Sequence, residues 1–170
     1  NSSTKWLVTL AQIVAVWTRR DFISPYIVLG AIGATFSTSS LKRLINQQRP
    51  VGAPFTDPGM PSSHALVSFF AATGWALLFR SAAASAVLLA CATVVSVLRV
   101  VCGYHTVAQV SVGALLGAVS AFGWMQLATV IAATVEPRTA FVAVWACYFG
   151  GSVLFLGKKL PAWLGKDAAL

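Results

Sequence analysis

The sequence is short of charged residues, and acidic residues are the scarcest of them. Charged side chains make up 9% of the 170 residues, and only 4 residues are Asp or Glu, whereas soluble domains contain about 25% charged residues. Hydrophobic residues make up 58% of the chain, and the mean hydropathy is +0.79. These values exclude an ordinary soluble globular protein and indicate an integral membrane protein.

The few acids and cysteines also exclude several kinds of site. The acids fall in four separate loops or tails, at Asp21, Asp57, Glu136 and Asp167. A two-metal carboxylate site is therefore not expected, and we predict chemistry without a metal or other cofactor. The cysteines lie in or beside apolar stretches without C-x-x-C spacing, at Cys91, Cys102 and Cys147. Because this spacing argues against a disulfide framework or a zinc site, we expect them to be small core residues.

Positive charge is the one ionic feature that the chain has in excess. The net charge is +8, which in a soluble protein would indicate nucleic-acid binding. The apolar stretches exclude a nucleic-acid-binding face, so we expect no such partner. Two interpretations remain, namely loop cations that meet anionic lipid headgroups and a site for an anionic substrate.

Six apolar segments separate the charged residues, over 6–18, 22–46, 61–79, 83–102, 105–134 and 139–157. A membrane-spanning helix needs about 20 mostly apolar residues, and the first segment is short for that. A lipid-facing backbone must satisfy its own hydrogen bonds, which makes such segments helical. The sequence therefore predicts an all-α integral membrane protein, a bundle of five to six transmembrane helices forming one domain over residues 1–170.

Polar residues gather where these segments end or begin. They are Lys42 and Arg49 after the second segment, "PSSH" (61–64) opening the third, Arg99 near the end of the fourth and His105 opening the fifth. Successive spans alternate in direction, so all four places lie at the same membrane face. We therefore expect an active site at one membrane face, built from residues 42–109.

Each of these motifs has an ordinary structural alternative. At "PSSH" the free backbone N–H groups of Ser62, Ser63 and His64 would form an anion site at a helix start, or the motif is a serine cap with an interfacial histidine. The cations of "KRLINQQRP" are seven residues apart and can share a face, or they reach to lipid headgroups. A single histidine at a helix start, like His105, is usually structural.

Their joint occurrence favours a catalytic site. An arginine within a span, such as Arg99, is costly and a functional suspect, and His105 can act near neutral pH. Phosphoryl transfer depends mainly on positioning and charge stabilisation, and guanidinium groups bind phosphate oxygens bidentately. One imidazole can attack phosphorus while a second protonates the leaving oxygen.

At these residues the chain resembles the type 2 phosphatidic acid phosphatase family, which includes lipid phosphate phosphatases. The family motifs are K-x6-R-P, P-S-G-H and S-R-x5-H-x3-D. Here they read "KRLINQQRP" (42–50), "PSSH" (61–64) and "LRVVCGYHTVAQ" (98–109).

The resemblance implies a role for each matching position. His105 would be the nucleophile that forms a phosphohistidine, and His64 the general acid. The phosphate ligands would be Lys42, Arg49, Arg99, Ser62 and the amides around Ser63 and His64.

Three positions depart from the family pattern: Ser63 replaces glycine, Leu98 replaces serine, and Gln109 replaces aspartate. We expect His105 and Gln109 to lie one helical turn apart and so in reach of each other. The Gln109 carbonyl can accept from Nδ1–H and fix the tautomer, but it lacks the charge that stabilises an imidazolium. An active enzyme with a less basic nucleophile is therefore expected.

The resemblance predicts a metal-independent phosphatase that acts on phosphatidic acid or a related lipid phosphate. Alternatives are a polyisoprenyl (dolichyl-type) diphosphate phosphatase and a lipid phosphotransferase. A non-catalytic transporter or scaffold is less favoured, because only one segment is broken by Pro and Gly. The run "DPGMPSSHA" resembles plastid epsilon-type lipid phosphate phosphatases, which implies the chloroplast inner envelope, with the endoplasmic reticulum membrane as the alternative. Membrane lipids are the other expected partners, and the oligomeric state stays open.

Overall fold

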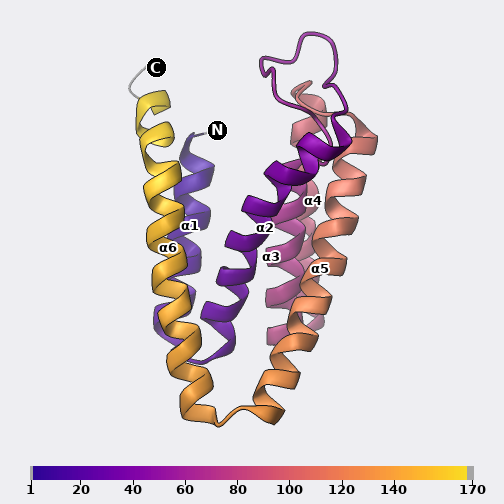
Figure 1. Ribbon diagram of the computed structural model, residues 1–170. Helices are drawn as coiled ribbons and strands as arrows, with labels where there is room; N and C mark the ends of the chain where they lie inside the picture. Colours follow the sequence, from indigo (N-terminus) through magenta and orange to yellow (C-terminus); the bar gives the residue numbers. More distant parts are fainter. Residues whose placement is uncertain (1, 168–170) are drawn as a thin grey trace. The chain divides into compact units, whose positions relative to one another are not determined.

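The computed structural model describes residues 2–167, and all regular secondary structure within them is helical (Figure 1). The helices are α1 (Ser2–Arg19), α2 (Ile23–Ile45), α3 (Ser63–Phe79), α4 (Ala82–Val101), α5 (Val107–Thr134) and α6 (Pro137–Asp167). The six helices correspond to the six predicted apolar segments. The prediction of an all-α fold is thereby confirmed.

Three helices have both the length and the hydropathy to cross a membrane, among the residues that the structure describes. They are α4, α5 and the part of α6 over Pro137–Pro161, and α3 is a shorter apolar helix. The second half of α2 carries "STSSLKR", which makes this half more polar than the first half of the same helix. The composition of the helices agrees with a membrane-embedded bundle.

The chain divides into two compact units, residues 1–32 with 130–170 and residues 33–129. The first unit contains α1, α6 and the adjoining ends of α2 and α5, and aromatic rings hold its helices together. The Trp17 ring lies edge-on to Trp145 and Phe149, at centroid distances of 6.0 Å and 6.3 Å. Such edge-to-face contacts are a favoured geometry for aromatic pairs.

In the second unit, α5 packs directly against the first turns of α3. A Cβ atom at Gly113 would lie 2.7 Å from the carbonyl oxygen of Ser62, and one at Gly117 would overlap the carbonyl oxygen of Leu66. Only hydrogen fits at these two positions, as expected for small residues four apart in membrane helices. This contact brings the start of α5 beside the "PSSH" segment.

The turn between α4 and α5 differs from the prediction. The fifth helix begins at Val107, not at residue 105, so His105 lies in the turn before it. The physical reason is Gly103, whose φ of +70° ends α4 in the left-handed conformation that glycine readily adopts. The backbone N–H groups of Tyr104 and His105 then both donate to the Arg99 carbonyl, at 3.0 Å and 3.2 Å.

Two further predictions are corrected. The terminal helices are longer than the apolar segments 6–18 and 139–157, because α1 begins at Ser2 and α6 continues through Pro161. The cysteines are exposed and not in the core, Cys91 and Cys147 on helices and Cys102 in the turn after α4. In a membrane helix a small apolar side chain gains little by burial, because lipid is as apolar as the protein interior.

Candidate active site

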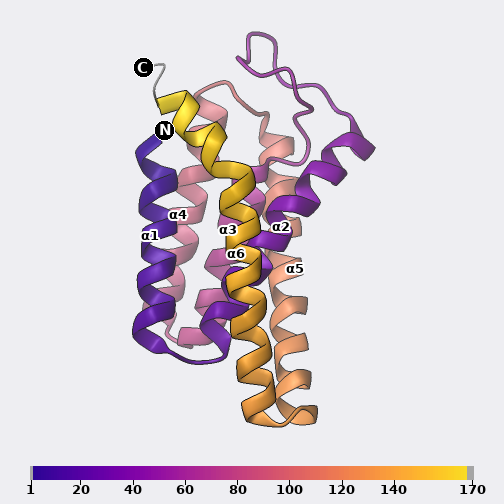
Figure 2. The same ribbon diagram turned by 60° about the vertical axis from the view of Figure 1, so that its left-hand side comes forward.

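The predicted site residues meet at one end of the second unit, where α2 and α4 end and α3 and α5 begin. Figures 1 and 2 show the loop between α2 and α3 at the same end as the turn between α4 and α5. Hydrogen bonds join these two connections. Arg49 donates from Nη1 to the Tyr104 carbonyl oxygen at 3.0 Å, and Gln109 donates from Nε2 to the Gln48 carbonyl oxygen at 2.8 Å. The α2–α3 loop and the turn between α4 and α5 therefore meet, as the order of the spans predicts.

Gln109 is completely buried, and its amide uses all four of its hydrogen-bonding positions. Nε2 donates to the Gln48 carbonyl and to Oε1 of Gln47, at 2.8 Å and 3.1 Å. Oε1 accepts from the Thr106 backbone N–H at 3.2 Å and lies 3.2 Å from Nδ1 of His105. A backbone carbonyl only accepts and a backbone N–H only donates, so the amide orientation is determined. It follows that Nδ1 of His105 carries the proton.

The other ring nitrogen of His105 therefore presents a lone pair. Nε2 of His105 lies 3.1 Å from Nη1 of Arg49, and a guanidinium group only donates. Burial, followed by the positive charge of Arg49, lowers the pKa of His105 to about 4, although the Gln109 hydrogen bond opposes the shift and the charges of Lys42 and Arg99 add to it. His105 is thus a neutral imidazole at pH 7, held in one tautomer with Nε2 unprotonated.

A carboxylate that sequence reasoning did not assign to the site lies among its cations. Asp57 Oδ2 is 2.5 Å from Lys42 Nζ. Both carboxylate oxygens of Asp57 accept from Nη2 of Arg49, at 2.9 Å and 3.0 Å. The side chains of Lys42 and Arg49 are 10% and 8% exposed, and that of Asp57 is 52% exposed. Burial alone would raise the pKa of Asp57, but the hydrogen bonds and charges of Lys42 and Arg49 outweigh it and leave this pKa below its ordinary value.

Gly59, in the same loop, also belongs to the site, and the sequence motifs did not indicate it. A Cβ atom there would lie 2.5 Å from Nε2 of Gln109, so the loop backbone packs directly on the amide that holds His105. The signal available in the sequence was the "DPG" turn itself, which predicts a turn but not what the turn contacts.

Arg99 is the site cation without a carboxylate partner among the described residues. Its guanidinium carbon lies 4.4 Å from the centre of the Tyr104 ring, a cation–π contact. Its Nε is buried and has no hydrogen-bond partner. A buried cation with an unused donor is costly, and an anion at this place would satisfy it.

The start of α3 differs in part from the prediction. Ser62 is the N-cap residue, and its Oγ accepts from the Ala65 N–H at 3.5 Å. Its own N–H is not free, because it donates to the Gln109 carbonyl oxygen at 3.0 Å. The donors that remain unpaired among the described residues are the backbone N–H groups of Ser63 and His64. Pro61 precedes the cap and does not occupy the first helical turn.

His64 lies in the first turn of α3 with an exposed side chain. Its ring interacts electrostatically with Arg99, His105, Lys42 and Arg49, so it belongs to the same cluster. No hydrogen bond from this ring to another described residue is present, which leaves both ring nitrogens available to a ligand.

The assembled site joins three cations, one carboxylate, a neutral imidazole and two free amides at a helix start. Guanidinium, ammonium and amide donors of this kind suit a tetrahedral phosphate. Within residues 2–167 no group of three His, Cys, Asp or Glu side chains is placed to hold a metal ion. Metal independence stays a prediction.

Comparison with known proteins places this site in a family context. The profile of the PAP2 superfamily matches residues 25–132. The chain is 34% identical over 132 residues to lipid phosphate phosphatase epsilon 2, chloroplastic, of Arabidopsis thaliana, covering 73% of this chain and 46% of that protein. It is 34% identical over 136 residues to lipid phosphate phosphatase epsilon 1, chloroplastic, of the same plant, covering 73% and 47%. The chain thus spans about half the length of these curated relatives, and no solved structure matches it.

Proposed function

Since this chain belongs to the PAP2 superfamily, we propose that it is a membrane-embedded phosphatase that hydrolyses a lipid phosphate, with phosphatidic acid as its substrate. The reaction passes through a phosphohistidine on His105 and requires no metal. The names of the two relatives, both lipid phosphate phosphatases, support the substrate class.

The observation that carries this proposal is the protonation state and placement of His105. Its neutral ring is held through Nδ1 by Gln109, and its Nε2 lone pair faces Arg49 at 3.1 Å. A nucleophile needs such a lone pair, and its attack needs a phosphorus held by cations within reach.

In the proposed first step the substrate phosphate replaces the Asp57 carboxylate at Lys42 and Arg49. Arg99 then donates its unused Nε–H to a phosphate oxygen, and the backbone N–H groups of Ser63 and His64 complete the cradle with Ser62. Once Nη1 of Arg49 turns from the imidazole to the phosphate, the lone pair on Nε2 of His105 is free to attack.

The bond changes then balance over two steps. Nε2 of His105 forms a bond to phosphorus as the bond between phosphorus and the lipid oxygen breaks. His64, which has taken up a proton on binding of the anionic phosphate, donates that proton to the lipid oxygen. His64, now neutral, takes a proton from water as the water oxygen attacks phosphorus. Inorganic phosphate leaves, and both imidazoles return to their starting states.

The test uses the purified full-length protein in detergent with EDTA, assayed for phosphate release from phosphatidic acid. We expect release in EDTA, complete loss with His105→Ala, and an acid-labile phosphoenzyme in the wild type that His105→Ala lacks. Ser85→Ala is a matched control, because Ser85 Oγ bonds its own helix at the Ser81 carbonyl. Release that stops with EDTA, or that persists in His105→Ala, contradicts the mechanism.

Substrate arms of the same assay separate the remaining alternatives. Faster release from an isoprenyl diphosphate would contradict phosphatidic acid as the substrate. Transfer of phosphate to an added alcohol in preference to water would make the protein a phosphotransferase, because water and alcohols attack the same intermediate.

We further propose that the protein resides in a chloroplast membrane, the inner envelope. Both relatives are named chloroplastic, and the apolar helices agree with a membrane location. Fractionation of plant cells that produce the full-length protein tests this, and recovery with endoplasmic reticulum membranes contradicts it.

A further inference from the structure

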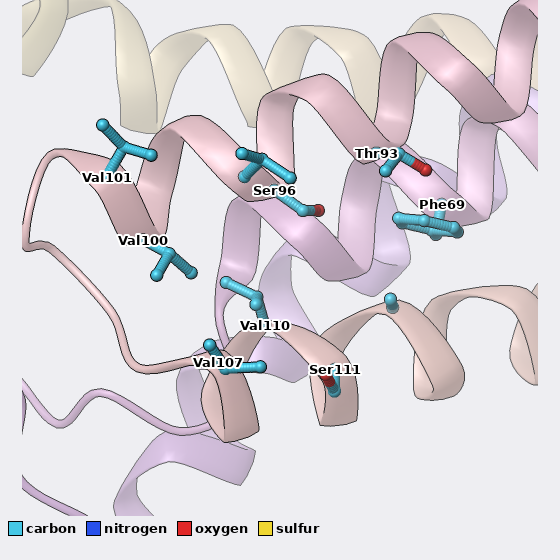
Figure 3. Close-up of a pocket in the computed structure, with 10 residues that line it drawn as sticks. Phe69, Thr93, Ser96, Val100, Val101, Val107, Val110 and Ser111 are labelled. Atoms are coloured by element: carbon cyan, nitrogen blue, oxygen red, sulfur yellow. The ribbon is translucent and has the colours of Figure 1, made fainter.

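An apolar groove of about 400 Å³ lies between α3, α4 and α5 and begins beside the active-site turn (Figure 3). Val100 and Val107 line the end of the groove near this turn, next to Arg99 and two residues after His105. Thr93 and Ala114 line it seven residues farther along the two helices, which is about 10 Å at 1.5 Å per residue.

The groove opens on the outer surface of the unit. Three lining valines are strongly exposed, with Val97 at 52%, Val101 at 75% and Val107 at 65%. Exposed apolar side chains on a helix that can cross a membrane face lipid. A lipid chain can therefore enter the groove sideways from the bilayer, with its headgroup at the active site.

Three residues that line the groove carry hydroxyls, namely Thr93, Ser96 and Ser111, and that of Ser96 differs from the other two. Ser96 is 7% exposed, and its Oγ is buried without any hydrogen-bond partner. Other hydroxyls on the same helix bond their own backbone, as Thr93 does with the Leu89 carbonyl at 2.8 Å. Figure 3 shows Ser96 on the side of α4 that faces α5, between Thr93 and Val100. An unsatisfied hydroxyl in a membrane protein is costly, so a ligand acceptor is the natural partner.

Ser96 also has a definite position relative to the phosphate site. It lies three residues before Arg99, so the two side chains share a helix face. Along the helix axis they are about 4.5 Å apart. An acceptor for Ser96 therefore lies about one helical turn deeper in the membrane than a phosphate bound by Arg99.

We propose that the groove holds the first part of an acyl chain of a glycerolipid phosphate, and that Ser96 Oγ donates a hydrogen bond to the ester carbonyl of that chain. This inference rests on the proposed phosphatase function and narrows its substrate class. In a diacylglycerol phosphate the ester carbonyl is a few bonds from the phosphate, at the depth of Ser96. An isoprenyl chain has no carbonyl and leaves Ser96 unpaired.

The groove and the serine contribute differently to recognition. A lipid tail in a bilayer or micelle is already in an apolar medium, so moving it into the groove adds little binding energy. The groove therefore acts through its shape. A site built to hydrogen-bond a substrate group discriminates against analogues that lack the group, because its own polar atom is left unpaired. Ser96 is thus a specificity residue for ester-linked lipids.

The experiment compares ester-linked with ether-linked diradylglycerol phosphates of equal chain length in mixed micelles. A tail-free soluble phosphate monoester serves as a third substrate. We expect wild-type kcat/KM to favour the ester by about three- to tenfold, the factor for one net hydrogen bond. Ser96→Ala should abolish this preference, and Ser96→Thr should retain it. Thr93→Val is the matched control, since it removes a hydroxyl from the same groove that is already bonded to its own helix, and it should leave the preference unchanged.

A second variant tests the groove independently of Ser96. Ala114→Phe fills the end far from the active site, and should slow hydrolysis of long-chain but not short-chain ester substrates. Retained activity on the short chain also shows that the variant is folded. Ala132→Phe, at an exposed position of the same helix, should leave both rates unchanged.

The outcomes separate this inference from the function on which it rests. If wild type is active on all substrates and Ser96→Ala keeps the wild-type ester-to-ether ratio, the role of Ser96 is wrong. Equal loss on long and short chains in Ala114→Phe contradicts the acyl groove. Absence of phosphate release from every substrate, the tail-free monoester included, contradicts the phosphatase function itself and the inference with it.

Discussion

Gln109→Glu should make the predicted nucleophile more basic, because it puts a negative charge beside His105 while changing the shape of the side chain very little. One carboxylate oxygen takes the place of Oε1, 3.2 Å from Nδ1 of His105. The other takes the place of Nε2, which lies 2.8 Å from the Gln48 carbonyl oxygen. The first contact gains charge, and the second loses a hydrogen bond.

The gain can be estimated from the pKa of His105. Burial and the charges of Arg49, Lys42 and Arg99 hold it at about 4 in the wild type. An opposite charge at this distance shifts a pKa by about 1–3 units, so the variant should have a His105 pKa of about 5–7. The sign is upward, because a carboxylate favours the protonated ring.

The loss can be estimated from the two donors of Nε2. Each removed hydrogen bond costs about 1 kcal/mol, and a buried acceptor left unpaired adds about 1–3 kcal/mol. Two lost hydrogen bonds and the unpaired acceptor together should make the variant less stable by about 3–5 kcal/mol. Gln109→Asp is the weaker test, because its carboxylate ends one methylene short of His105.

The assay is kcat/KM against pH on the soluble phosphate monoester, at a temperature below the melting point of the variant. Protonated His105 cannot attack, so the acid limb of the profile should rise by about 1–3 pH units in Gln109→Glu. At pH 5 the variant should lose activity that the wild type retains. Gln126→Glu, at an exposed position of α5, adds the same charge away from the site and should leave the acid limb in place. An unmoved acid limb in Gln109→Glu would show that Gln109 is not the partner of His105.

Two further predictions concern the cations and the helix packing. Asp57→Asn removes the carboxylate that is paired with Lys42 and Arg49. Inorganic phosphate should therefore inhibit the variant about three- to tenfold more strongly than the wild type. An unchanged inhibition constant would mean that Asp57 does not compete with phosphate. Gly117→Ala should lower the melting temperature by about 4 °C or more, since its Cβ overlaps a backbone carbonyl of α3. Gly123→Ala, whose Cβ meets nothing within 4 Å, is the control, and equal melting temperatures would contradict the close packing.

Features of the fold that depend on local composition were predictable. Hydropathy and the spacing of charges predicted five to six helices, because each apolar segment must form a helix whatever its neighbours are. Small residues four apart, like Gly113 and Gly117, are typical of a close helix contact, but their spacing does not identify α3 as the partner. Exposure of the cysteines was not predictable from apolarity, since the outer surface of a membrane protein is as apolar as its core.

The candidate site shows the same division. The sequence predicted that Gln109 can accept from Nδ1 of His105, and the two atoms are 3.2 Å apart. The prediction placed both residues on one helix, one turn apart, and this part was wrong, because His105 lies in the turn before α5. The turn follows from Gly103 and from two N–H groups that return to the Arg99 carbonyl. Neither periodicity nor spacing reveals such bonds.

The class of protein, a count of five to six helices and the end of the bundle at which the chemistry-bearing residues meet could all be predicted from the amino-acid sequence. These follow from hydropathy and from the alternating direction of successive spans, which are properties of each segment and of its order. Which atoms face one another became known from the packed molecule: Asp57 lies between Lys42 and Arg49, the Gln109 amide contacts the α2–α3 loop, and Ser96 is unpaired in its groove. Such contacts depend on how residues far apart in the chain are packed together, and a loop of Pro and Gly residues carries no period from which its final position could be read.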